Sequence, residues 1–232
     1  MLSKGTIAGT ALCLGFTLQT LGLSRTTPAI TGFITGLYVV LTPVIGSLIL
    51  KDKLPVKAWG YVALATIGLA ILSISGWQVG VGEVLVLIST FFYAGHILFL
   101  GAWSRDFDAY ALTFVQLTTC AVVAAIPALL NGFQAPSDLQ TWGVVLFTAI
   151  FCTVIAFIIQ TWSQARISAT KVAVILTMEV VFAAFFSVLF GAEPLTWRIS
   201  IGGGCVLIAM LAIVQPKISQ STDSLRESSH GR

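Results

Sequence analysis

Charged residues are scarce in this chain of 232 residues, because Asp, Glu, Lys and Arg together make up only 9% of it. A soluble domain carries roughly a quarter charged residues, so this composition cannot cover a surface that faces water. Hydrophobic residues make up 57% of the chain, and the mean hydropathy is +0.98. The sequence therefore predicts an integral membrane protein. The net charge of +3 is not gathered into a basic patch with interleaved aromatics, so we expect no nucleic-acid partner.

Side chains that bind metals or perform catalysis are also few. The chain has two histidines, His96 and His230, and four cysteines without Cys-x-x-Cys spacing. No second histidine or cysteine stands at ligand spacing from His96, which argues against a metal site. Paired carboxylates, a histidine cluster and a nucleophile elbow are missing, so a membrane-embedded lipid-modifying enzyme remains only a weak alternative. We expect no enzyme activity and no cofactor.

Long apolar stretches fill most of the chain and are joined by short connections. Each is close to the ~20 residues that a helix needs to cross a bilayer, and alternation with period two is absent. The pattern predicts an all-α membrane protein, a polytopic bundle of eight transmembrane helices. The expected spans are 5–23, 28–50, 57–75, 83–103, 109–130, 142–164, 169–191 and 198–214.

Two stretches of the chain are nearly the same. The stretch "FTLQTLGLSR" begins at Phe16 and "FIIQTWSQAR" begins at Phe157, with Phe, Gln, Thr and Arg at identical offsets. The register that pairs Phe16 with Phe157 also aligns the first three spans with the last three without a gap. Matched spans are five apart, so they cross the membrane in opposite directions, which is typical of the inverted-topology repeats of secondary transporters. By this register the first repeat lacks two helices, roughly 60 residues, that the second repeat has.

Cations are distributed unequally between the two ends of the expected helices. With Met1 in the cytoplasm, ten fall on the inner side and two, Arg25 and Arg198, on the outer side. This bias follows the positive-inside rule and predicts a multi-pass protein of the cytoplasmic (cell) membrane with both termini in the cytoplasm. The ten inner cations are Lys4, Lys51, Lys53, Lys57, Arg105, Arg166, Lys171, Lys217, Arg226 and Arg232.

Two longer stretches resemble a known family. "FTLQTLGLSRTTPAITGFITGLYVVLTPVIGSLILKDKLP" looks like the first-repeat core of the EamA-type family in the drug/metabolite transporter superfamily, and "ISATKVAVILTMEVVFAAFFSVLFGAEPLTWRISIGGGCVLIAMLAIV" is similar to its second-repeat core. The resemblance implies a ten-helix fold of two inverted five-helix repeats that moves small metabolites. Eight helices are visible here, because the family's first two have no counterpart. We therefore expect a partial first repeat at 1–75, a complete second repeat at 83–214 and a disordered cytoplasmic tail at 215–232.

Glu179 is the candidate residue for a proton or substrate pathway, because it is the lone acid in the middle of an apolar span. A carboxylate at mid-bilayer costs on the order of 3 kcal/mol or more, so such groups usually face a cavity. The alternative is a protonated glutamate that bonds a neighbouring helix. The resemblance places this glutamate on a cavity-lining helix, and Tyr38 is its repeat-mate. His96 could relay protons with Glu179, although a lone histidine more often makes an interhelical hydrogen bond.

Three glutamines lie where lipid would not solvate their amides. Gln19, Gln160 and Gln116 should point into the bundle, where they either join helices or bind a polar substrate. Pro43 and Pro127 interrupt their helices and are candidate hinges.

Taken together, these features predict a secondary transporter that moves a small organic metabolite or drug-like solute by alternating access. Proton coupling through Glu179 is a further hypothesis. One alternative is an incomplete or partner-dependent homologue without transport activity of its own. The expected partners are a small-molecule substrate and the lipid bilayer, and a homo-oligomer stays open.

Overall fold

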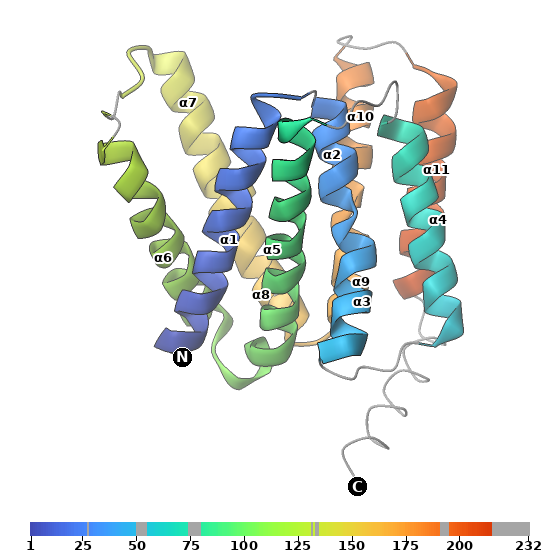
Figure 1. The fold of residues 1–232 in the computed structure, drawn as a ribbon, viewed down its shortest axis with the longest axis horizontal. Coiled ribbons are helices and arrows are strands. Elements are labelled where there is room, and N and C mark those ends of the chain that lie inside the picture. The colour runs from blue at the N-terminus through green and yellow to red at the C-terminus, as the bar shows by residue number, and fades with distance from the viewer. Residues whose placement is uncertain are drawn as a thin grey trace, which may run out of the picture.

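The structure is a computed structural model that describes residues 1–26, 28–49, 55–73, 80–130, 132, 135–190 and 195–214. Helices account for nearly all of this part of the chain, and it contains no strand (Figure 1). The region expected to form a disordered tail lies outside the described residues. Each of the eight expected spans is confirmed as one helix or as consecutive helices.

Eleven α-helices and two short helical segments of other types make up the described part of the chain. In sequence order they are α1 (Leu2–Leu23), α2 (Pro28–Gly36), α3 (Tyr38–Ile49), α4 (Val56–Ser73), α5 (Val81–Trp103), the short η1 (Ser104–Asp106), α6 (Ala109–Leu130), α7 (Leu139–Phe147), the π-helix η2 (Thr148–Ile155), α8 (Ala156–Gln164), α9 (Ala169–Leu176), α10 (Met178–Leu189) and α11 (Trp197–Val214).

Length and hydropathy suit these helices to a bilayer. Five described segments are long and apolar enough to cross a membrane: Leu2–Leu23, Ile30–Leu48, Val81–Asp106, Ala109–Leu130 and Leu139–Gln164. Two shorter apolar helices cover Val56–Ile71 and Trp197–Ala212, and the consecutive helices α9 and α10 supply the remaining span. The fold is a polytopic helical membrane bundle, as the composition predicts.

The helix directions confirm the inverted repeat. In Figure 1, α1 and α4 run upward while their repeat-mates, α7 to α8 and α11, run downward. The middle pair is likewise opposed, because α2 and α3 run downward and α9 and α10 run upward. The two repeats meet where α1 packs on α5 and where α4 packs on α11.

Both middle spans are broken at matching positions. The first is interrupted at Leu37, between α2 and α3, and the second at Thr177, between α9 and α10. In the register that pairs Phe16 with Phe157, the two breaks fall one residue apart. Val40 donates to the Leu37 carbonyl, and Val180 donates to the Thr177 carbonyl, so a tight turn links the half-helices in each repeat. Pro43 lies inside α3, beyond the first break, and Pro127 lies inside α6.

The repeats differ in how their first matched helix is covered. Helix α1 packs against α5 and α6 and buries small residues such as Gly5, Ala8 and Gly9. Its repeat-mate begins with α7 and η2, which have no buried residue. In the described part of the chain, no pair of helices packs against α7 in the way that α5 and α6 pack against α1. The exposed side chains of α7 and η2 are mainly apolar and are compatible with lipid.

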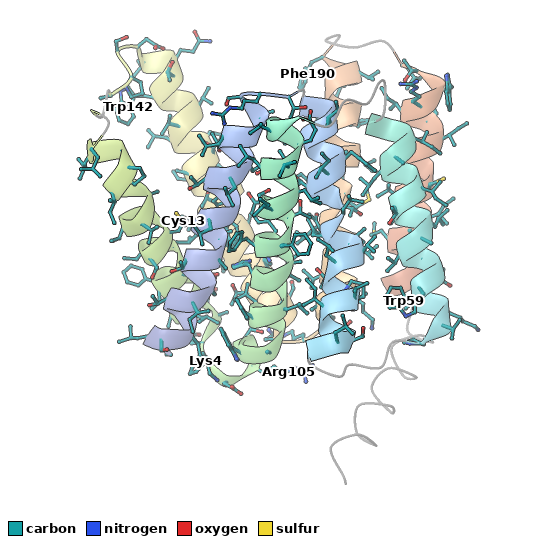
Figure 2. The ribbon with its side chains drawn as sticks, in the orientation of Figure 1. Lys4, Cys13, Trp59, Arg105, Trp142 and Phe190 are labelled. Atoms are coloured by element: carbon teal, nitrogen blue, oxygen red, sulfur yellow. The ribbon has the colours of Figure 1, made fainter. Side chains whose placement is uncertain are left out.

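Cations gather at one end of the bundle. Figure 2 shows Lys4 and Arg105 at the same end as the N-terminus, whereas Trp142 and Phe190 mark the opposite end. Arg166 follows α8 at the first of these ends, and Arg198 opens α11 at the other. The Lys4 ammonium contacts the Asp106 carboxylate at 3.4 Å and lies 5.2 Å from the centre of the Phe107 ring.

Asp138 caps the start of α7 and provides a pH-dependent prediction. Its carboxylate accepts hydrogen bonds from the Thr141 amide and the Thr141 hydroxyl, both at 2.7 Å, and these bonds hold the pKa of Asp138 below its ordinary value of 3.8. A lowered folded-state pKa means that the cap stabilises α7 above the ordinary pKa and is lost as the pH falls through the folded-state pKa. In Asp138→Ala, amide hydrogen exchange at Thr141 should be several-fold faster at neutral pH, and Asp138→Asn should stay near the native rate. Equal exchange in Asp138→Ala and the native protein would contradict this role.

Candidate functional site

One cavity lies between α1, α2, α3, α5, α8, α9 and α10, and its volume is about 150 Å³. It is not closed, because Phe16 and Glu179 in its wall are exposed. The residues that line it are Leu12, Phe16, Gln19, Thr35, Tyr38, Tyr93, His96, Ile97, Phe157, Gln160, Leu176 and Glu179.

Eight of these twelve residues form repeat-related pairs. The register of the two similar stretches pairs Phe16 with Phe157, Gln19 with Gln160, Thr35 with Leu176 and Tyr38 with Glu179. The cavity therefore lies where the two repeats face each other, and the recurring Phe-x-x-Gln of the two similar stretches lines its wall from both sides. The other four lining residues come from α1 and α5.

The helix breaks bring the polar members of these pairs to the cavity. Tyr38 is the first residue of α3, and Glu179 is the second residue of α10, so each follows directly on a break. Discontinuous helices at a repeat interface are the usual setting of substrate sites in transporters with this architecture. The breaks thus explain why a hydroxyl and a carboxyl at matching positions face one space.

Gln19 joins three helices on one side of the cavity. Its side-chain nitrogen donates to Thr35 Oγ1 at 2.9 Å, and its oxygen accepts the Tyr93 hydroxyl at 2.7 Å. The amide of α1 thereby fixes α2 and α5. This confirms that the amide points into the bundle, and it shows bonds between helices at both polar atoms of Gln19.

His96 lines the cavity and also belongs to a second network, which extends behind the cavity wall. The His96 ring is 2% exposed, and its Nε2 lies 2.8 Å from Gln116 Oε1. Gln116 Nε2 in turn donates to Thr161 Oγ1 at 3.0 Å. Because a carbonyl oxygen only accepts, His96 Nε2 is the donor in this bond. The network joins α5, α6 and α8.

Glu179 stands apart from both networks. Among the residues that the structure describes, its carboxylate accepts no hydrogen bond, and the one ion pair is that of Lys4 with Asp106. The hydroxyls of Tyr38 and Tyr93 lie within electrostatic reach of the carboxylate. Glu179 is thus an unpaired acid on the cavity wall, which favours a functional role over a bond to a neighbouring helix.

The structure brings five of the six expected pathway residues together: Glu179, His96, Tyr38, Gln19 and Gln160. Gln116 lies behind His96 and is not among the lining residues described. His96 bonds Gln116 instead of Glu179, so the described contacts do not form a direct relay between the histidine and the acid.

Sequence reasoning missed several residues of the site. Tyr93 lies on the helix that follows the first repeat and has no repeat-mate in the chain. Gln164 is buried and donates to the Ile97 carbonyl at 2.6 Å, while Gln160 donates to Gln164 Oε1 at 3.1 Å. Phe16 and Phe157 carried a signal, because they are identical in both stretches, and their ring centres lie 6.2 Å apart.

Known proteins resemble this chain along most of its length. An "Uncharacterized transporter" from Archaeoglobus fulgidus is 34% identical over 206 residues, which is 88% of this chain and 66% of that relative. The "Pseudopaline exporter CntI" from Pseudomonas aeruginosa is 26% identical over 173 residues, 74% of this chain and 60% of the exporter. The chain thus spans about two thirds or less of the length of these curated relatives.

The fold likewise has a counterpart among solved structures. A crystal structure superposes with a TM-score of 0.75 at 13% sequence identity, covering 92% of this chain and 85% of the other, a likeness that concerns the fold alone. The family model of the EamA-like transporters matches residues 80–215, more than half of the chain. With the inverted repeats and the cavity between them, this match shows that the chain belongs to the EamA-like transporter family.

Proposed function

We propose that this chain is a secondary transporter that moves a small organic solute across the cytoplasmic membrane through the cavity between its repeats. The proposal rests on one observation above all: four repeat-related residue pairs meet in a single cavity at the breaks of two helices. In inverted-repeat transporters the solute binds at this position, and one repeat rocks against the other to open each side in turn.

The comparisons support transport of a small solute. One relative is named a transporter and another an exporter, and the matching family is one of transporters. The gathering of Lys4, Lys57, Arg105 and Arg166 at the end of the bundle that holds the N-terminus supports a cytoplasmic location for that end. Coupling to protons through Glu179 belongs to the same proposal, because a carboxyl on the cavity wall can alternate between a proton and the solute.

Filling the cavity tests this proposal. Vesicles that contain the purified chain are loaded with a mixture of small amines, amino acids and carboxylic acids, diluted, and their contents followed by mass spectrometry. The native chain should deplete at least one solute. Leu176→Trp should slow that depletion about tenfold or more, because the indole occupies most of a cavity of about 150 Å³.

Leu211→Trp is the matched control, because Leu211 is 56% exposed on α11 and lies outside the cavity. It should deplete the same solute at the native rate. Equal depletion by Leu176→Trp and Leu211→Trp would show that the solute does not pass through this cavity. Retention of every solute by the native chain would favour the homologue without transport activity of its own.

A further inference from the structure

We propose that the ligand of this cavity is a small organic cation, an amine with a compact apolar part, and that Glu179 pairs with its positive charge. This inference deepens the proposed function, on which it rests, by naming the substrate class of the same site. It is carried by the charge of the cavity wall, by the free hydrogen-bonding atoms there and by the rings beside them.

The charge of the wall has one sign. Glu179 is the single carboxylic acid among the described lining residues, and neither lysine nor arginine lines the cavity with it. An ionised carboxylate at membrane depth is costly without a counter-charge. Because the described part of the bundle supplies none, a bound cation is the ligand that the carboxylate would stabilise most.

The two glutamine amides of the wall already make hydrogen bonds, whereas the Glu179 carboxylate has none described. Gln19 uses its nitrogen and its oxygen on Thr35 and Tyr93, so it has little left for a ligand. Gln160 also lines the cavity and donates from its nitrogen to Gln164. The Glu179 carboxylate lines the same cavity without a described hydrogen bond, and it suits an ammonium group, since an ammonium offers donors alone.

Aromatic rings cover the apolar part of the wall. The ring centre of Phe16 lies 5.8 Å from that of Tyr93 and 6.2 Å from that of Phe157. Rings of this kind attract a cation through their π-faces and also contact apolar groups. The volume of about 150 Å³ limits the ligand to roughly the size of a single substituted ring.

Three probes of one size and different charge test the inference: benzylamine, benzyl alcohol and benzoate. Their binding to the purified native chain is measured by isothermal titration calorimetry at neutral pH, with protein-free micelles as the blank. Benzylamine should bind about ten- to a hundredfold more tightly than benzyl alcohol, the range expected for hydrogen bonds to a charged group. Benzoate should bind more weakly than either.

Glu179→Gln keeps the shape of the side chain and removes its charge, so benzylamine and benzyl alcohol should then bind equally. The matched control is Asp106→Asn, which makes the same chemical change at the exposed ion pair with Lys4, outside the cavity. This variant should keep the native preference for the amine. Equal binding of the three probes to the native chain, tighter binding of benzoate, or a preference for the amine that survives in Glu179→Gln would each overturn the inference.

This binding experiment is independent of flux. If vesicles deplete a neutral or anionic solute through the cavity while the amine shows no preferential binding, the proposed function stands and the inference fails. If the amine binds through Glu179 and no solute crosses the vesicle membrane, the inference stands and the transport proposal fails.

Discussion

Replacing Glu179 with glutamine should slow the uptake of tetramethylammonium into vesicles about tenfold or more and make the remaining uptake independent of pH, because it removes the charge that attracts the cation. Tetramethylammonium is charged at every pH and does not cross lipid unaided, so any pH dependence of its uptake comes from the protein. On the proposed mechanism, a proton and the cation compete for the Glu179 carboxylate. Uptake should therefore fall as acidification protonates Glu179, whereas the amide in Glu179→Gln neither titrates nor attracts the cation.

Three other titratable groups face Glu179 across the cavity, and the experiment must separate them. Tyr38 lies on α3, and Tyr93 and His96 lie on α5. Of these three residue types only histidine has an ordinary pKa near neutral pH, so His96 needs a variant of its own. Its variant His96→Gln should keep the pH dependence of the native chain, because the ring is bonded to Gln116 behind the wall.

Glu179→Asp is the second comparison, because it keeps the charge and shortens the side chain. It should retain pH-dependent uptake at a reduced rate. A native rate and a native pH profile in Glu179→Gln would remove Glu179 from the pathway. If uptake by His96→Gln did not depend on pH while uptake by Glu179→Gln still did, the coupling role would belong to His96.

Most of the fold follows from the sequence because the bilayer leaves few choices. A span in lipid has to satisfy its own backbone hydrogen bonds, so apolar stretches of about twenty residues become helices. The ungapped register between the two repeats then fixes the antiparallel relation of matched helices, since five spans separate them. The same register explains why Phe16 and Phe157, or Tyr38 and Glu179, face one cavity.

Other features could not be predicted, because they depend on contacts between helices. Gly36 precedes the break at Leu37, but a single glycine also lies inside many helices, and Pro43 follows the break by more than one turn, so the sequence alone does not fix the break there. The segment of the first repeat that matches the π-helix η2 lies inside α1 and is ordinary α-helix, so the same place in the two repeats has two helix types. Tyr93 reaches the cavity, and Gln116 the network behind it, only because α5 and α6 pack against α1.

Replacing Gly9 with alanine should lower the free energy of unfolding by about 1–3 kcal/mol, the usual cost of inserting a methyl group into a packed interior. A Cβ atom at Gly9 would lie 2.3 Å from the Gln116 carbonyl oxygen and 2.8 Å from Thr119 Cβ. The first neighbour is backbone, so α1 and α6 would have to separate. Because Gln116 also bonds His96 and Thr161, that separation should loosen the network behind the cavity as well.

Gly32→Ala is the control, because a Cβ atom there would meet nothing within 4 Å. Alanine favours a helix over glycine by about 0.5–1 kcal/mol, so this variant should be as stable as the native chain or more stable. Unfolding in mixed detergent micelles, followed by circular dichroism, measures both variants.

The repeat-mate of Gly9 is Ile150, a large residue that is 48% exposed on η2. A glycine is therefore needed at this place in the first repeat because α6 packs against it. Equal loss of stability in Gly9→Ala and Gly32→Ala would show instead that α1 and α6 do not approach so closely.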